Sequence, residues 1–91
     1  MRYLVQHLAR NLAVELGPRR VTANTLSPGF FPSKLANGLI DKIGDAIIAR
    51  APLRRIGNEE DLKGAVAYLA SDASRHMTGQ ALVIDGGASL F

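Results

Sequence analysis

The first part of the chain carries apolar side chains at helical spacing. They recur on one face at Leu4, Val5, Leu8, Ala9, Leu12, Ala13 and Leu16. This period of about 3.6 residues predicts an amphipathic helix over residues 2–16, whose apolar face should lack neighbours within this chain. We expect the helix to end at Gly17-Pro18, because glycine adopts the left-handed conformation readily and proline cannot continue the helical hydrogen bonds.

Two short apolar runs have the pattern of buried strands. Residues 21–26 are rich in β-branched side chains and are bounded by turn formers, so they predict a strand that leads into Ser27-Pro28-Gly29. Residues 81–84 form a continuous apolar run that ends at Asp85-Gly86-Gly87. Such a run is typical of a strand that is covered on both faces.

Two helical segments lie between these strands. Residues 32–50 contain Gly38 and Gly44, which predict two short helices separated by a bend. Asn58 has the side chain of an N-cap, and Asp61 follows three positions later, so a second helical segment should begin at Asn58 and end near Ser71.

The predicted order is helix, strand, helical insert, helix, strand. A strand, a crossover helix and a second buried strand form a βαβ unit, whose parallel strands belong to a larger sheet. We therefore predict an α/β fold, the C-terminal fragment of a Rossmann-type doubly wound parallel sheet, with residues 1–91 as one partial domain. The first helix should likewise follow an earlier strand, which the sequence does not contain.

Composition narrows the possible functions. The 91 residues include no cysteine, which excludes disulfides and thiolate metal sites, and His7 and His76 have no ligand partners at suitable spacing, so we expect no metal site. The net charge is +3, but the basic pairs 19–20 and 54–55 lack interleaved aromatic residues, so we expect no nucleic-acid partner. Since no apolar run approaches about 20 residues, we expect a soluble, cytoplasmic protein without a membrane partner.

The loop after the first predicted strand is the best candidate for chemistry. Ligands of open α/β sheets bind beyond the carboxyl ends of the strands, where Pro28-Gly29 could bring bare backbone close to a flat ring. A hydroxyl at Ser33 could reach a phosphate. Pro-Gly is also a common tight turn, and those two residues alone favour that simpler interpretation.

Several segments together resemble the short-chain dehydrogenase/reductase family, and particularly its 3-oxoacyl-reductase-like and gluconate-5-dehydrogenase-like members. In family order they are residues 12–18, 21–24, 27–29 with Ser33, 52–57 with 60–61, 69–72, 78–80 and 83–87. The resemblance implies an oxidoreductase that binds NAD or NADP and transfers hydride between an alcohol and a ketone or aldehyde. It also implies a homo-oligomer, because the first helix resembles the one through which many members dimerise.

Family roles transfer only to matching residues. The resemblance implies that Pro28 and Gly29 lie against the nicotinamide, that the backbone of Phe30 or Phe31 contacts its carboxamide, and that Ser33 stands near the diphosphate. The matching Asn24 and Asp61 are better explained by structural hydrogen bonding and by the charge at a helix start. The apolar residues of segment 34–50 would line a substrate pocket or form a lid, namely Leu35, Leu39, Ile40, Ile43, Ile47 and Ile48.

The family's catalytic residues have no match. Family members bind their cofactor with a G-x-x-x-G-x-G turn, and this chain contains none. They also use a catalytic tyrosine that is followed four positions later by lysine. Neither Tyr3 nor Tyr68 is followed by lysine at that spacing, so both tyrosines are interpreted as packing residues. Arg2 stands where that lysine would be. We therefore assign no catalytic residue and predict that the isolated chain is inactive and does not fold as a stable monomer.

Three functions remain open. The chain is part of an oxidoreductase, or it is a non-catalytic remnant that acts only through helix-mediated association, or, least favoured, it is a small basic nucleic-acid-binding protein. The substrate and the choice between NAD and NADP are not encoded in these residues.

Overall fold

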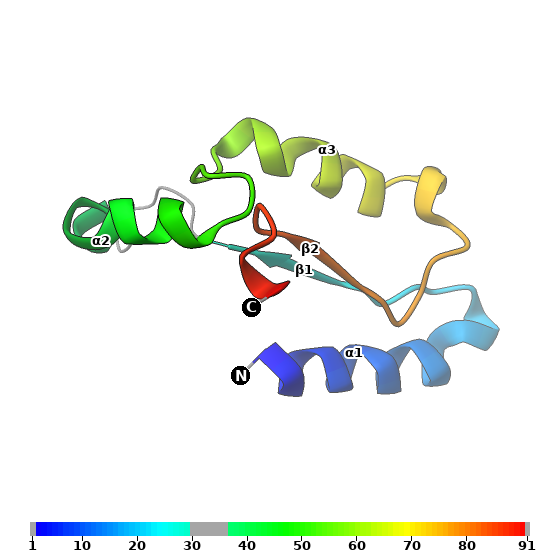
Figure 1. Ribbon diagram of the computed structural model, residues 1–91. Helices are drawn as coiled ribbons and strands as arrows, with labels where there is room; N and C mark the ends of the chain where they lie inside the picture. Colours follow the sequence, from blue (N-terminus) through cyan, green and yellow to red (C-terminus); the bar gives the residue numbers. More distant parts are fainter. Residues whose placement is uncertain (1, 30–36, 91) are drawn as a thin grey trace. The chain divides into compact units, whose positions relative to one another are not determined.

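The computed structural model describes residues 2–29 and 37–90. Its helices and strands follow the predicted order (Figure 1). They are α1 (Arg2–Leu16), β1 (Thr25–Pro28), α2 (Asn37–Arg50), α3 (Glu59–Leu69) and β2 (Ala81–Ile84), with short 3-10 helices at Gly17–Arg19, Asp72–Ser74 and Ala88–Leu90.

The strands β1 and β2 are hydrogen-bonded neighbours. The backbone N–H of Thr25 donates to the Gln80 carbonyl over 2.9 Å, and the N–H of Gly29 donates to the Ile84 carbonyl over 3.0 Å. Both residue numbers increase in the same direction, so the strands are parallel. A parallel pair with helices between its strands confirms the predicted α/β fold class.

The first strand begins later than the sequence predicted, at Thr25 in place of residue 21. The Ala23 N–H donates to the Thr78 hydroxyl over 3.0 Å, and the Asn24 side chain donates to the Met77 carbonyl over 3.0 Å and accepts from the Gln80 N–H over 3.1 Å. Together with the backbone hydrogen bond from the Gly79 N–H to the Ala23 carbonyl, 2.8 Å long, these side-chain hydrogen bonds interrupt the regular strand ladder before Thr25.

The prediction of two helices within residues 32–50 was wrong for the part that the structure describes. A single helix, α2, spans Asn37–Arg50 and includes both Gly38 and Gly44. A glycine inside a helix costs about 1 kcal/mol relative to alanine, which the surrounding helix-forming residues offset. The glycines therefore weaken the helix without dividing it.

The end of α1 agrees with the prediction, but its conformation differs. The helix ends at Leu16, and Gly17–Arg19 continue as a 3-10 turn. The left-handed residue is Arg20, with φ 61° and ψ 33°, and not Gly17. Gly17 and Pro18 both belong to this 3-10 turn, so the chain reverses at Arg20 instead.

The start of α3 confirms the predicted cap. The Asn58 side-chain oxygen accepts a hydrogen bond from the Glu60 N–H over 2.9 Å, and the Asp61 carboxylate accepts one from the Asn58 N–H over 2.8 Å. These reciprocal bonds satisfy backbone donors that the first helical turn leaves without partners.

The chain forms two compact units, which we call unit 1 (residues 1–27 and 64–82) and unit 2 (residues 28–63 and 83–91). In unit 1 the buried side of α1 carries Ala9 and Ala13, each 7% exposed, whereas Leu4 and Leu8 are 67% and 57% exposed. The leucine row of α1 is therefore largely uncovered within this chain, as expected for a helix whose apolar face lacks neighbours. In the described part of unit 2, Ala51 is buried.

The second strand, β2, has the predicted bounds, but its side chains alternate between exposed and half-buried. It is therefore not covered on both faces within this chain.

Among the residues that the structure describes, no helix is long and apolar enough to cross a membrane.

Candidate functional site

Pro28 and Gly29 stand where β1 ends, and both are exposed. The hydrogen bond from the Gly29 N–H to the Ile84 carbonyl holds this turn at the carboxyl end of the parallel pair. In open α/β sheets this is the edge at which ligands bind. The other predicted loop residues, Phe30, Phe31 and Ser33, lie outside the described residues.

Gly29 is in close contact with the end of β2. A Cβ atom added to Gly29 would lie 2.9 Å from the Asp85 Cβ and 3.0 Å from the Asp85 Cα. These distances are shorter than ordinary carbon–carbon contacts, so a larger residue would displace one of the two chains. The absence of a side chain at Gly29 therefore allows the two strand ends to meet.

The turn after β2 is fixed by the Asp85 carboxylate. It accepts hydrogen bonds from the Gly87 N–H over 2.8 Å and from the Ser89 N–H over 2.9 Å. Gly86 and Gly87 have φ angles of 64° and 90°, a conformation that favours glycine. The sequence Asp-Gly-Gly therefore forms a rigid support beside Gly29.

The same turn contacts the loop that follows α2. A Cβ atom on Gly87 would lie 2.7 Å from the Pro52 Cγ, and the Leu53 N–H donates to the Gly86 carbonyl over 3.1 Å. These contacts join the end of β2 to the loop that follows the segment 34–50, which the family resemblance assigns to substrate covering.

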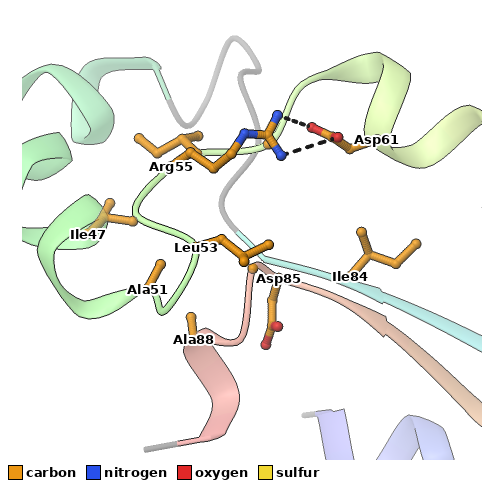
Figure 2. A pocket seen from close by; sticks show the side chains of 11 residues that line it. Ile47, Ala51, Leu53, Arg55, Asp61, Ile84, Asp85 and Ala88 are labelled. Carbon is orange, nitrogen blue, oxygen red and sulfur yellow. Dashed lines mark hydrogen bonds and ion pairs between the residues drawn. The ribbon is translucent and has the colours of Figure 1, made fainter.

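A cavity of about 170 Å³ lies within unit 2. Figure 2 shows apolar side chains from α2, its following loop and β2, with an ion pair at one side and the Asp85 carboxylate directed away from that pair. The cavity is lined by Ile47, Ala51, Leu53, Arg55, Ile56, Gly57, Asp61, Ile84, Asp85, Gly86 and Ala88. Of the apolar residues predicted to line a pocket or form a lid, Ile47 is the described one that lines this cavity.

The ion pair joins Arg55 to Asp61. The guanidinium donates to both carboxylate oxygens, over 2.7 Å and 3.3 Å. The hydrogen bond from Arg55 and the backbone hydrogen bond from Asn58 lower the pKa of Asp61, and the same pair raises the pKa of Arg55. Both groups therefore remain charged at neutral pH.

Sequence reasoning identified Asp61 as a helix-start residue but missed its pairing with Arg55. It also missed the contact between Asp85 and Gly29. The Asp-Gly-Gly sequence signals a turn, but no local pattern states which other segment meets that turn. Such contacts depend on the tertiary fold.

Among the described residues, the other candidates from the sequence do not form a catalytic arrangement. Asn24 links the loops that precede the two strands of unit 1, which supports its structural interpretation. His7 and His76 are exposed, and Tyr68 is 40% exposed, so it is only partly packed. The side chains of Arg2 and Tyr3 lie outside the described part of the structure.

Comparison with known proteins places the chain in a family. Residues 1–89 match the sequence model described as Enoyl-(Acyl carrier protein) reductase. The 3-oxoacyl-[acyl-carrier-protein] reductase FabG of Staphylococcus epidermidis is 39% identical over 80 residues, which are 88% of this chain and 33% of that protein. Nodulation protein G of Rhizobium sp. is 39% identical over 82 residues, 90% of this chain and 34% of that protein.

Solved structures give the same result. A short-chain type dehydrogenase/reductase from Mycobacterium marinum is 42% identical, with a TM-score of 0.86 over 93% of this chain and 33% of that one. A gluconate 5-dehydrogenase from Burkholderia cenocepacia, in complex with NADP and tartrate, is 34% identical, with a TM-score of 0.90 over 96% of this chain and 35% of that one.

The chain spans about a third of the length of the curated relatives that it matches. Its parallel strand pair is similar to the corresponding part of these Rossmann-type structures, in agreement with the predicted fold class. The match over residues 1–89, together with these relatives, shows that the chain belongs to the short-chain dehydrogenase/reductase family of oxidoreductases.

Proposed function

We propose that this chain supplies the C-terminal third of a cytoplasmic, homo-oligomeric NAD(P)-dependent oxidoreductase that interconverts an alcohol and a ketone or aldehyde. Residues 1–91 would form part of one Rossmann-like domain. The observation that carries the proposal is the exposed Pro28-Gly29 turn at the carboxyl end of the parallel strands, held against Asp85 in a chain of this family.

The described residues fit the nicotinamide end of the cofactor. Pro28 and Gly29 are exposed and carry little side-chain bulk, which suits contact with an aromatic ring. In the proposed site, Phe30, Phe31 and Ser33 continue the contact toward the carboxamide and the diphosphate. When bound, the nicotinamide supplies or accepts the hydride, and the role of this chain is to hold and orient that ring.

An alternative function is association without catalysis. The side chains of Leu4, Leu8 and Leu12 form an exposed row on α1, with exposed fractions of 67%, 57% and 38%. A continuous apolar row of this kind favours burial against another surface. In this alternative, the chain would bind a second copy or a related subunit and carry out no chemistry.

The deciding experiment identifies where translation begins. The transcript start is mapped, and the protein translated from it, which we call the complete product, is assayed for NADH and NADPH oxidation with a panel of ketones and aldehydes. An upstream Tyr-x-x-x-Lys segment together with turnover supports the oxidoreductase. Translation from Met1 without turnover supports the association function.

A substitution at Gly29 tests the cofactor loop directly. In the complete product, Gly29→Ala should weaken NAD(P)H binding roughly tenfold, because the added methyl group displaces the turn and each 1.4 kcal/mol corresponds to a factor of ten. Cofactor affinity is measured from the fluorescence of bound NADPH or NADH.

The matched control is Gly17→Ala. A Cβ at Gly17 would meet nothing within 4 Å, so the same methyl group should leave the affinity unchanged. Equal affinity in the wild type and the Gly29 variant, with the fold intact by circular dichroism, would argue against a cofactor role for this turn.

A further inference from the structure

A second hollow, in unit 1, is separate from the cofactor loop. Cationic and hydroxyl side chains line it, and we call it the basic hollow. Its polar lining consists of Arg20, Thr22, Arg75, His76 and Thr78. Thr22 and Thr78 precede β1 and β2, so the basic hollow lies at the amino ends of these strands, whereas Pro28-Gly29 follows the carboxyl end of β1.

The charge in the basic hollow is not neutralised within the described structure. Among the described residues that line it, none carries a carboxylate. The ion pairs that the described part of the chain forms join Arg55 to Asp61 and Lys63 to Glu60. The two guanidinium groups of the hollow therefore retain their positive charge for another anion.

Among the described residues, the hydrogen bonds around the basic hollow use few of its side-chain donor groups, which leaves several to spare for an anion. The Arg75 guanidinium makes one long hydrogen bond of 3.5 Å, to the Asp72 carbonyl, and retains its other N–H groups. The Thr78 hydroxyl oxygen accepts from the Ala23 N–H over 3.0 Å, so its own proton remains for donation. Arginine and hydroxyl donors together match the multiple acceptor oxygens of a tetrahedral oxyanion.

Arg20 is held in place by an uncommon backbone conformation. Its φ and ψ angles of 61° and 33° are left-handed, and its N–H donates to the Gly17 carbonyl over 2.9 Å. Glycine adopts this conformation without steric cost, whereas arginine does not. A long cationic side chain therefore lines the hollow at a position where glycine would suit the backbone better.

We propose that the basic hollow binds a phosphate-type oxyanion, as the free ion or as the phosphate group of a small phosphate monoester. Arg20 and Arg75 would neutralise the charge, and His76 with Thr78 would donate to the remaining oxygens. The cofactor loop contributes no residue, so this proposal does not depend on the oxidoreductase activity. Binding here and turnover of NAD(P)H are separate measurements.

The test titrates the complete product with inorganic phosphate and, in a second series, with methyl phosphate. Sodium chloride keeps the ionic strength constant, and backbone amide shifts in two-dimensional NMR report the site. We expect saturable shifts at residues 20–22 and 75–78. Saturation by inorganic phosphate alone indicates a site for the free ion, and saturation by both indicates a site that also accepts an ester.

Two variants and one matched control complete the test. Arg20→Gly removes the guanidinium in a backbone conformation that suits glycine, and Arg75→Gln removes the second charge; each should weaken phosphate binding roughly tenfold, the effect of losing a charge-assisted hydrogen bond. Arg54→Gly is the control, because Arg54 also has a left-handed φ of 56° but does not line the basic hollow. It should leave the affinity unchanged.

The proposal fails if phosphate shifts these amides no more than chloride does at the same ionic strength. It also fails if Arg54→Gly weakens binding as much as Arg20→Gly, because the effect would then be that of net charge alone. If the Arg20 variant does not fold, Arg75→Gln decides, since Arg75 lies in an ordinary helical conformation that glutamine accepts.

Discussion

At the scale of single residues, Asp61 combines two interactions at the start of α3. Its carboxylate caps the helix through the Asn58 N–H and also pairs with Arg55. Both interactions require or favour the ionised form, so the pKa of Asp61 is lower in the folded protein than the ordinary value of 3.8. The group consequently links the stability of this region to pH.

This linkage predicts the behaviour of Asp61→Asn. A depressed carboxyl pKa stabilises the folded state above the ordinary value, and that contribution disappears as the pH falls through the folded-state pKa. We expect the complete product with Asp61→Asn to be slightly less stable than wild type at pH 7, with the difference vanishing in acid. Arg55 is exposed and Asp61 is half-buried, so solvent screens the pair and keeps the effect small.

Urea denaturation at a series of pH values measures this difference. Glu60→Gln is the matched control, because it removes the same charge from the same helical turn. Among the described residues, the Glu60 carboxylate pairs with the exposed Lys63. A stability difference for the Asp61 variant that stays constant from pH 7 to pH 3 would contradict the assigned origin of the pKa shift.

Residue-scale features were predictable from the sequence where the interaction is local. The Asn58 cap and the Asp61 carboxylate lie within one helical turn of each other, so their spacing alone identified them. The contact between Gly29 and Asp85 joins segments far apart in the chain, and no local pattern encodes it. The left-handed Arg20 was missed because the sequence supplied Gly17 as the more favourable candidate.

At the scale of elements, an exposed glycine inside a helix allows a prediction about the stability of the folded protein. Gly64 lies in α3, is exposed, and a Cβ there would meet nothing within 4 Å. Gly64→Ala should therefore raise the unfolding free energy of the complete product by about 0.5–1 kcal/mol, mainly by restricting the unfolded chain. Thermal and urea unfolding measure the gain.

The matched substitution is Gly79→Ala. Gly79 has a φ of 71°, and a Cβ there would lie 3.4 Å from the Ala13 Cβ, so the same added methyl group should be destabilising. If both variants changed stability in the same direction, backbone conformation would not be the deciding factor.

Element types and order could be predicted because each depends on a local pattern. The helical spacing of apolar residues predicted α1, the Asn58 cap predicted the start of α3, and the apolar run 81–84 predicted β2 with its observed bounds. The first strand begins later than predicted because side chains take part in the pairing before Thr25. The Thr78 hydroxyl accepts from the Ala23 N–H, and the Asn24 side chain accepts from the Gln80 N–H. In unit 2 the prediction was wrong at α2, because helix propensity overestimated how strongly Gly38 and Gly44 interrupt a helix.

At the scale of the whole molecule, little of the chain is shielded from water. The buried side chains among the described residues are Ala9, Ala13, Ala51 and Ser74. Three of them are alanines, whose burial contributes little because the hydrophobic gain scales with the area removed from water. Large apolar side chains, including Leu4, Leu8 and Leu53, remain exposed.

We therefore predict that the 91-residue chain alone does not form a stable monomer. Dilute samples should show no sharp cooperative transition on heating, and concentrated samples should associate. Circular dichroism melting and analytical ultracentrifugation across a concentration series test this. A cooperative transition whose midpoint is independent of concentration would contradict the prediction.

The triple substitution of Leu4, Leu8 and Leu12 by Gln separates the causes of association. If the exposed row on α1 is responsible, the variant should sediment as a smaller species than the unmodified chain at the same concentration. Unchanged association would instead point to the open edges of the strand pair.

The pairing of Thr25 with Gln80 also has a consequence for how the chain is made. The two residues are 55 positions apart, so β1 emerges from the ribosome well before the strand that completes its pairing. At about 5–20 residues per second, roughly 3–11 seconds of synthesis separate them. During that interval the helices can form locally, whereas this strand pair cannot, so the later strand, β2, determines when the pair reaches its native structure.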